Sequence, residues 1–244
     1  MREIVRLALF EWRQVDVRVV FNGLTACILC ALVFYLLTSA EAGINIVKGF
    51  LDFGFLLTTT IWIGMVHEKG FMLMELPPST WSSPFYSYAR RLPISEKQLF
   101  RSRVLVKGVQ APVIVVIGIC LMEIFQPILP FSFSDASFYS FLALWASIAF
   151  ISTSTALDEI GVRYQKRIHL YGQAYLYILL LVLFYLVVWV WFIPFDDTFM
   201  MFSVYLAEKF PFLSFGIAIL IGIVTFITVL FLGDKRINRK GKMA

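Results

Sequence analysis

Charged residues are scarce in this sequence. They make up 15% of its 244 residues, while hydrophobic residues make up 60%. A soluble domain usually has about 25% charged and about 45–50% apolar residues. A water-soluble fold of this length could not bury so much apolar surface, and no stretch is polar enough to form a separate soluble domain. The composition therefore excludes a soluble globular protein and predicts one membrane domain over residues 1–244.

Residues that carry redox, metal or hydrolytic chemistry are also few. His67 and His169 are the two histidines, and no HExxH or paired-glutamate motif occurs. Cys27 and Cys30 have the CxxC spacing of a redox or metal motif. However, they lie inside an apolar run, as does Cys120, and a free cysteine there commonly packs as a small hydrophobic residue. We expect no catalytic residue, no metal site and no cofactor bound by this chain.

A nucleotide-binding loop is missing as well. The pattern G-x-x-x-x-G-K-[ST] does not occur, and the Gly-Lys-Met sequence at residues 241–243 lacks both the upstream glycine and the hydroxyl residue. The chain is therefore not expected to bind ATP through such a loop. The start, MREIVRLALFEWR, has no small-residue cleavage site after a short apolar core, so we expect no removable signal peptide.

Six apolar segments are long enough to cross a bilayer. A hydrocarbon core about 30 Å thick needs roughly 20 apolar residues in a helix, and unsatisfied backbone groups are too costly in lipid for an irregular chain. The predicted spans, first to sixth, are residues 18–38, 47–66, 104–125, 136–157, 173–195 and 212–233. The predicted fold class is therefore an all-α integral membrane protein with six transmembrane helices.

Lysine and arginine residues predict the orientation, because cytoplasmic loops of membrane proteins carry an excess of them. With the amino terminus in the cytoplasm, all of the 21 except Lys48 and Lys209 lie on the inside. Both chain ends, the loop 67–103 and the basic tail 234–244 are then cytoplasmic. The net charge of +5 thus reflects topology and attraction to anionic lipid of the inner leaflet. Nucleic acid is not an expected partner.

Two further segments have helical character but are not expected to span the membrane. Residues 1–17 should form an amphipathic interfacial helix, because three arginines lie within about 40° on a helical wheel. Glu11 falls inside the apolar arc of this helix, which makes the amphipathic pattern imperfect. Residues 195–211 are apolar but too short to span, which is typical of a re-entrant or interfacial segment.

The loop between the second and third spans contains a basic stretch, YARRLPISEKQLFRSR, at residues 88–103. Pro93 disfavours a helical conformation of the residue before it. Ser95, followed three residues later by Gln98, forms a capping box. We therefore predict a helix that starts near Glu96, whose negative charge suits the positive end of a helix. This helix should continue into the third span.

This stretch and the six-span layout resemble the permease subunits of type-2 ATP-binding-cassette (ABC) exporters. In that family, a coupling helix between spans two and three docks on a separate ATPase subunit. The amino-terminal helix lies along the inner membrane surface, and short external re-entrant helices join spans five and six. The Pro- and aromatic-rich insert at 77–88 is longer than the usual linker of the family. The residues that would couple the chain to the ATPase are Arg90, Arg91, Leu92, Pro93, Ile94, Ser95, Glu96 and Gln98.

The resemblance also implies partners and a location. ATP and Mg would be bound by a partner ABC ATPase subunit. Six spans are half of a typical transport domain in this family, so a homodimer or a pair with a second related permease is expected. The chain would be a multi-pass protein of a bacterial plasma membrane, in contact with membrane lipid and with both termini in the cytoplasm.

Polar side chains inside predicted spans usually indicate a transport pathway. The candidates are Asp52, Gln110 and Glu123. Lys48 and Asp52 are spaced i, i+4, so they could instead pair with each other and anchor the helix. Lys107 lies one turn inside the third span and is expected to extend its ammonium group to the membrane surface.

Three functions stay open on this reading. The favoured one is the membrane subunit of an ATP-driven exporter of a peptide, lipid or drug-like amphipathic substrate. The acidic outer surface and the apolar spans favour an amphipathic or cationic molecule. The alternative is a non-transporting membrane sensor or self-immunity protein that binds a peptide. An intramembrane enzyme is least favoured, because no cluster of catalytic residues lies at membrane depth.

Overall fold

In the computed structural model, helices form nearly all of the regular structure that is described. The described residues are 2–13, 17–39, 45–63, 74–76, 80–89, 91, 93–125, 134–159, 176, 179–180, 182–183, 185–187 and 198–240. Within them, three helices are long and apolar enough to cross a membrane. These three cover Glu96–Leu121, Asp135–Thr155 and Pro211–Asn238, and they coincide with the third, fourth and sixth predicted spans. An all-helical class with several apolar, membrane-length helices is therefore confirmed, apart from one short hairpin in a loop.

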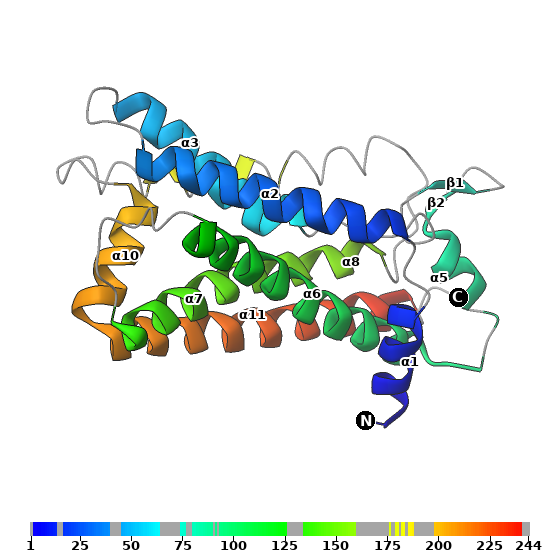
Figure 1. The fold of residues 1–244 in the computed structure, drawn as a ribbon. Coiled ribbons are helices and arrows are strands. Elements are labelled where there is room, and N and C mark those ends of the chain that lie inside the picture. The colour runs from blue at the N-terminus through cyan, green and yellow to red at the C-terminus, as the bar shows by residue number, and fades with distance from the viewer. Residues whose placement is uncertain are drawn as a thin grey trace.

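The long helices run side by side along one bundle axis (Figure 1). They are α2 (Val17–Ser39), α3 (Asn45–Leu57), α6 (Glu96–Phe125), α7 (Asp135–Phe150) and α11 (Pro211–Lys240). α7 packs against both α11 and α6, and α2 packs against both α6 and α3. α2 and α3 overlap the first and second predicted spans, whereas most of the fifth predicted span lies outside the described residues. The count of six spans therefore stays a prediction.

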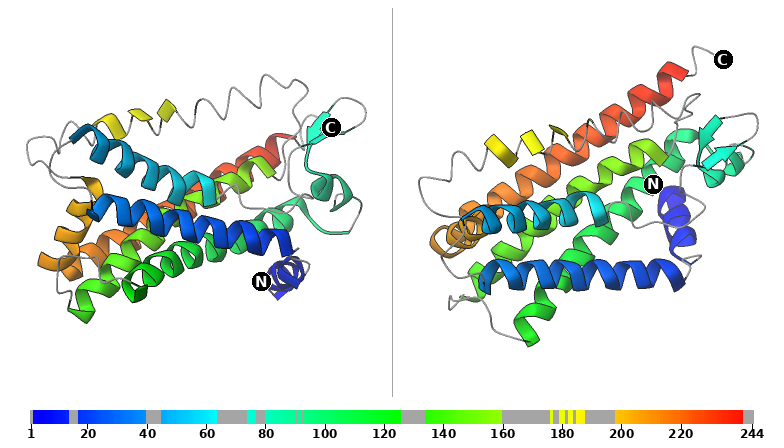
Figure 2. Two further views of the ribbon diagram at one scale, coloured as in Figure 1. Left: turned by 45° about the horizontal axis from the view of Figure 1, so that its top comes forward. Right: turned by 90° about the horizontal axis from the view of Figure 1, so that it is seen from above.

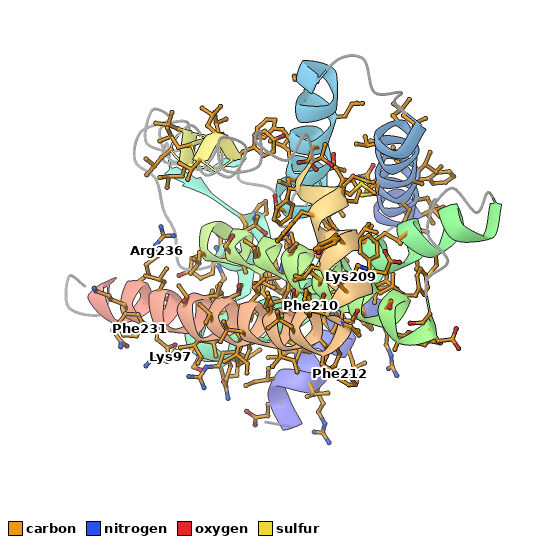
Figure 3. All side chains as sticks on the ribbon, turned by 90° about the vertical axis from the view of Figure 1, so that its left-hand side faces the viewer. Lys97, Lys209, Phe210, Phe212, Phe231 and Arg236 are labelled. Atoms are coloured by element: carbon orange, nitrogen blue, oxygen red, sulfur yellow. The ribbon has the colours of Figure 1, made fainter. Side chains whose placement is uncertain are left out.

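α11 presents a broad apolar surface away from the bundle. Phe212 and Phe231, towards its two ends, are 92% and 64% exposed (Figure 3). Only about a tenth of the most apolar stretch of this helix is buried inside the protein. An exposed apolar patch of this length is typical of a surface that contacts lipid or another protein. This surface is the expected lipid-facing or subunit-facing side of the sixth span.

Two of the long helices depart from α-helical geometry where they meet. α3 continues into a π-helical turn, η1 (Thr58–Trp62), and α7 continues into a 3₁₀ turn, η3 (Ile151–Thr155), followed by α8 (Ala156–Glu159). η1 and η3 contact each other. The hydroxyl groups of Thr58 and Thr59 donate to carbonyl oxygens four residues earlier, at 2.7 and 2.9 Å. These buried hydroxyls are thus satisfied within their own helix, as a polar residue at membrane depth requires.

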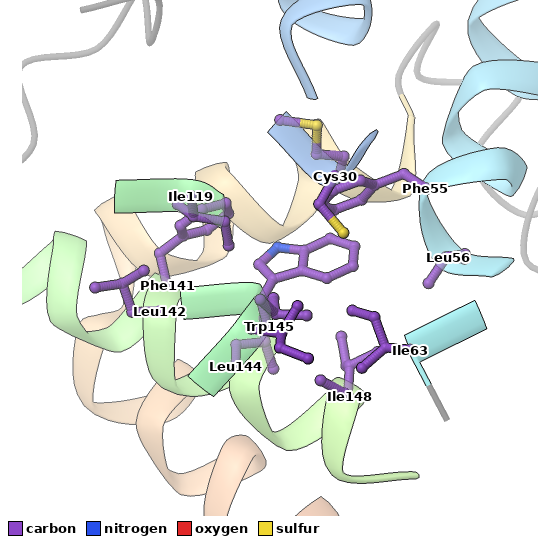
Figure 4. Packing of buried hydrophobic residues seen from close by; sticks show 14 of the residues in the cluster. Cys30, Phe55, Leu56, Ile63, Ile119, Phe141, Leu142, Leu144, Trp145 and Ile148 are labelled. Carbon is purple, nitrogen blue, oxygen red and sulfur yellow. The ribbon is translucent and has the colours of Figure 1, made fainter. Parts of the chain in front are cut away.

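The main hydrophobic core surrounds Trp145, which is fully buried on α7 (Figure 4). Its ring packs on that of Phe55 of α3 in a T-shaped arrangement, with ring centroids 4.5 Å apart. Its Nε1 donates to Ser203 Oγ at 3.1 Å, so the polar atom of the indole is satisfied inside the core. Ser203 belongs to α10 (Phe199–Lys209). One aromatic side chain therefore ties together α3, α7 and α10.

The two ends of the bundle differ. α10 lies across one end, within the segment 195–211 that the sequence predicts to be a short non-spanning helix (Figures 1 and 2). The other end carries α1 (Arg2–Arg13), α5 (Pro84–Ala89), the carboxy-terminal part of α11, and an antiparallel hairpin of β1 (Met74–Leu76) and β2 (Thr80–Ser82). We call these the α10 end and the terminal end. The sequence did not predict the hairpin.

The start of α6 confirms the predicted capping box. α6 begins at Glu96, and the Gln98 N–H donates to Ser95 Oγ at 3.2 Å. In return, the Ser95 N–H donates to Gln98 Oε1, also at 3.2 Å. The helix then runs without interruption to Phe125. The predicted third span and the last two predicted coupling residues, Glu96 and Gln98, are therefore parts of one continuous helix, which the other coupling residues precede in the chain.

We expect Ser95→Ala to lower the free energy of unfolding by about 1 kcal/mol, because it leaves the Gln98 N–H without its capping acceptor. Ser95→Asp keeps a side-chain oxygen at this position and should lose much less. Thermal unfolding of the two purified variants in the same detergent measures the difference. An equal loss in both variants would contradict the capping role.

Candidate functional site

The terminal end has its own buried hydrophobic cluster, separate from the core around Trp145. The cluster joins α5, α6, α8 and α11. Its fully buried members are Tyr86, Leu99, Phe100, Val104, Ala156, Leu157 and Val229. Ile94, which belongs to the predicted coupling stretch, packs against it. α5 and Ile94 are thus packed onto α6, α8 and α11.

α5 is anchored on this cluster by one face. Ser83 caps it, since its Oγ accepts from the Tyr86 N–H at 3.0 Å. The Tyr86 side chain is 2% exposed, whereas that of Tyr88 is 63% exposed. The Arg91 N–H donates to the Tyr88 carbonyl at 2.9 Å, and the Arg91 side chain is exposed. One aromatic residue therefore fixes α5, and another projects outward beside an exposed arginine.

A buried ion pair fastens α1 to α6. Arg103 Nη1 lies 3.3 Å from Glu11 Oε2, and both side chains are about 95% buried. Ser102 Oγ lies 3.0 Å from the other oxygen, Glu11 Oε1. Gln98 Nε2 also donates to Glu3 Oε2 at 2.7 Å. These contacts explain why an acidic residue occupies the apolar arc of the amino-terminal helix: Glu11 faces α6, not lipid.

Lys107 lies one turn further along α6 and is only 2% exposed. The expectation that it extends to the membrane surface is wrong. Its part of α6 packs closely against η3, and a Cβ on the adjacent Gly108 would lie 2.7 Å from the Phe150 ring. Because the helices approach so closely here, the side chain is enclosed by protein.

The carboxy-terminal part of α11 is tied to the same place. Arg101 Nη2 lies 3.1 Å from Asp234 Oδ2 in a partly exposed ion pair. Arg236 Nη1 donates to the carbonyl oxygen of Leu157, in α8, at 2.9 Å. The Phe100 ring packs directly on Gly233, so closely that any Cβ there would overlap it. α11 therefore extends past the predicted span as a helix that stays bound to α6 and α8.

The structure places most of the predicted coupling residues on one surface at the terminal end. Arg91, Pro93 and Ser95 are exposed, and Ile94, Glu96 and Gln98 are partly buried. Arg90 and Leu92 lie outside the described residues. The exposed residues therefore sit directly before the continuous helix α6, with the hydrophobic cluster beneath them.

The three predicted pathway residues have different surroundings. Asp52 is 1% exposed and accepts hydrogen bonds from backbone N–H groups of α10. Gln110 is partly buried on α6. Glu123 belongs to α6, but its side chain lies outside the described part, as does that of Lys48, the other predicted partner of Asp52. Asp52 is thus engaged in holding a helix in this structure.

Sequence reasoning missed several residues that build the terminal end. The position of Glu11 in an apolar arc was a usable signal, because a buried acid needs a partner. No sequence signal indicated that Phe100 packs on Gly233. Among the described residues, no group of three or more His, Cys, Asp or Glu side chains could hold a metal ion. Comparisons with protein-family models, curated proteins and solved structures found no match.

Proposed function

We propose that this chain is the membrane permease subunit of an ATP-driven ABC transporter, energised by a separate ATPase that docks at the terminal end. The observation that carries the proposal is the continuous helix α6, which starts at a capped, exposed loop and runs through the membrane-length segment. A partner bound to the loop would thus act directly on a helix that crosses the bilayer.

The docking surface in this proposal consists of the described residues Tyr88, Arg91, Pro93 and Ser95, together with the adjoining predicted coupling residues Arg90 and Leu92, whose placement lies outside the described residues. Its basic character suits an acidic partner surface, and an exposed aromatic beside an arginine is typical of residues that dominate binding energy. The ATPase would supply work by binding this surface differently in its ATP-bound and ATP-free states, because a ligand shifts an equilibrium only through differential affinity. In this proposal, the nucleotide is bound by the ATPase subunit.

The wider assignment follows from the same hypothesis. The protein would lie in a plasma membrane with both termini in the cytoplasm, and it would pair with a second copy or a related permease. The substrate class we propose is an amphipathic peptide, lipid or drug-like molecule. The broad apolar face of α11 is consistent with either a lipid contact or a subunit contact.

The test is copurification of ATP hydrolysis with the tagged chain from its own cells. The complex should hydrolyse ATP, and changing Arg90, Arg91 and Leu92 together to alanine should abolish copurification of the ATPase. The matched control changes Arg6 and Arg13, exposed basic residues of α1, to alanine and should leave the complex intact. An intact complex in the triple variant would refute the docking surface. Protection against a peptide without any ATPase would favour the sensor alternative.

A further inference from the structure

The helix α10 is capped by a residue from another helix. Asp52 of α3 accepts from the Phe199 N–H at 2.9 Å and from the Met200 N–H at 3.1 Å, one bond to each carboxylate oxygen. Thr198, the N-cap of α10, accepts from the Met201 N–H at 3.2 Å. The first N–H groups of a helix have no partner inside the helix. Here they are satisfied, two of them by a carboxylate that also suits the positive end of the helix.

α10 closes over the core with one face. Val204 and Ala207 are fully buried on it, and Ser203 accepts the hydrogen bond from Trp145. On the opposite face, Tyr205 is 52% exposed. The helix therefore covers the hydrophobic core at this end of the bundle, and its removal would uncover that core.

A single residue connects α10 to α11. α10 ends at Lys209 and α11 begins at Pro211. Between them, Phe210 has φ −136° and ψ 63°, outside the helical region, and it is exposed (Figure 3). Proline has no N–H to continue a helix. α10 is thus joined to α11 through one non-helical residue, packs against α11 and α7, and is bonded to α3 through Asp52.

Tyr185 supports the same arrangement from the predicted fifth span. Its hydroxyl donates to the Gly49 carbonyl at 2.6 Å and lies 3.4 Å from Asp52 Oδ2. Asp52 is therefore enclosed by its own helix, by Tyr185 and by the first turn of α10. This one carboxylate supplies both of the hydrogen bonds that α3 makes to the start of α10.

We propose that Asp52 is a latch that holds α10 closed over the α10 end of the bundle. Loss of its two bonds would let α10 swing about Phe210 and expose the face that carries Val204. The latch rests on the geometry above and on the orientation predicted from charge. Its use as an outer gate for substrate release rests on the proposed function.

Cysteine labelling in intact cells tests the latch. The parent has its three native cysteines replaced by alanine and carries Val204→Cys, which is buried when α10 is closed. A membrane-impermeant maleimide added outside should label it slowly. Asp52→Ala should raise the labelling rate by more than about 100-fold, because it removes two hydrogen bonds to a charged group, and the loss of one such bond (about 1.5–3 kcal/mol) already corresponds to about ten- to 100-fold. Asp52→Asn keeps one acceptor oxygen and should raise the labelling rate less than Asp52→Ala. If the alanine variant does not reach the membrane, the rate in the Asp52→Asn variant serves as the test.

Two controls make each outcome decisive. Tyr205→Cys, on the exposed face of α10, should be labelled rapidly from outside with or without Asp52. Ser140→Ala, a buried polar change whose hydrogen bond lies within α7, should leave the Val204→Cys rate unchanged. Parent-level labelling in both Asp52 variants, an equal rise with Ser140→Ala, or labelling of Tyr205→Cys only from the cytoplasmic side would overturn the latch. None of these readouts involves an ATPase, so the latch and the proposed function can fail separately.

Discussion

Glu11→Ala is expected to destabilise the protein by about 3–5 kcal/mol and to detach α1 from the bundle. The change leaves the Arg103 guanidinium buried without its carboxylate, and an unpaired buried charge carries a large desolvation cost. Both side chains of the pair are about 95% buried, so solvent does not screen the loss. The free energy of unfolding in detergent measures the first effect, and the rate of proteolysis near residues 14–16 measures the second.

A double variant separates the buried charge from simple loss of packing. Glu11→Leu combined with Arg103→Met removes both charges, and replacing a buried ion pair by apolar residues is often neutral or stabilising. The double variant should therefore recover most of the stability. Arg13→Ala, on an exposed position of the same helix, should change stability by less than about 0.5 kcal/mol. A stable Glu11→Ala protein with α1 still protected would show that this pair does not fasten α1.

The second large effect is expected at Gly233, where α11 passes α6. A Cβ at this position would overlap the Phe100 ring, and Phe100 is 1% exposed, so its ring has little room to move. Gly233→Ala should cost about 1–3 kcal/mol through overpacking. It should also separate the ends of the two helices and weaken the nearby contact of Arg101 with Asp234. Thermal unfolding and a distance measurement between spin labels on the two helix ends check both effects.

Gly222 provides a matched control on the same helix. A Cβ there meets nothing within 4 Å, and alanine is the better helix former by about 1 kcal/mol. Gly222→Ala should therefore be neutral or stabilising. If Gly233→Ala behaved in the same way, the close contact between α6 and α11 would not exist in the membrane, and the terminal-end cluster would not join α11 to the docking loop.

The features of this fold that the sequence predicted are those set by residues close together in the chain. The helix start predicted near Glu96 is confirmed, because Ser95 and Gln98 satisfy each other within four positions, which needs no information from the rest of the chain. The apolar, membrane-length helices are equally local, because span length and hydropathy belong to one segment. The short helix after residue 195 was predicted for the same reason.

Contacts between distant segments could not be predicted in this way. Glu11 and Arg103 are 92 positions apart, and Asp52 and Phe199 are 147 positions apart. Pattern reasoning therefore assigned Asp52 to a pathway or to Lys48, whereas the structure engages it with α10. The burial of Lys107 was missed because it depends on how closely η3 packs on α6. The apolar character of each helix could be predicted from its own sequence. The partners of buried charged side chains could not, because they lie on other helices.

The central claim is that the terminal end, with α1, the end of α11, the capped start of α6 and the docking surface, faces the compartment that contains ATP. Reporter fusions after Ala244 test it most directly. A fluorescent protein that matures only in the cytoplasm should be bright, and an alkaline phosphatase that folds only outside should be inactive. The opposite result, a dark fluorescent fusion with an active phosphatase, would contradict the orientation and with it the ATPase partner.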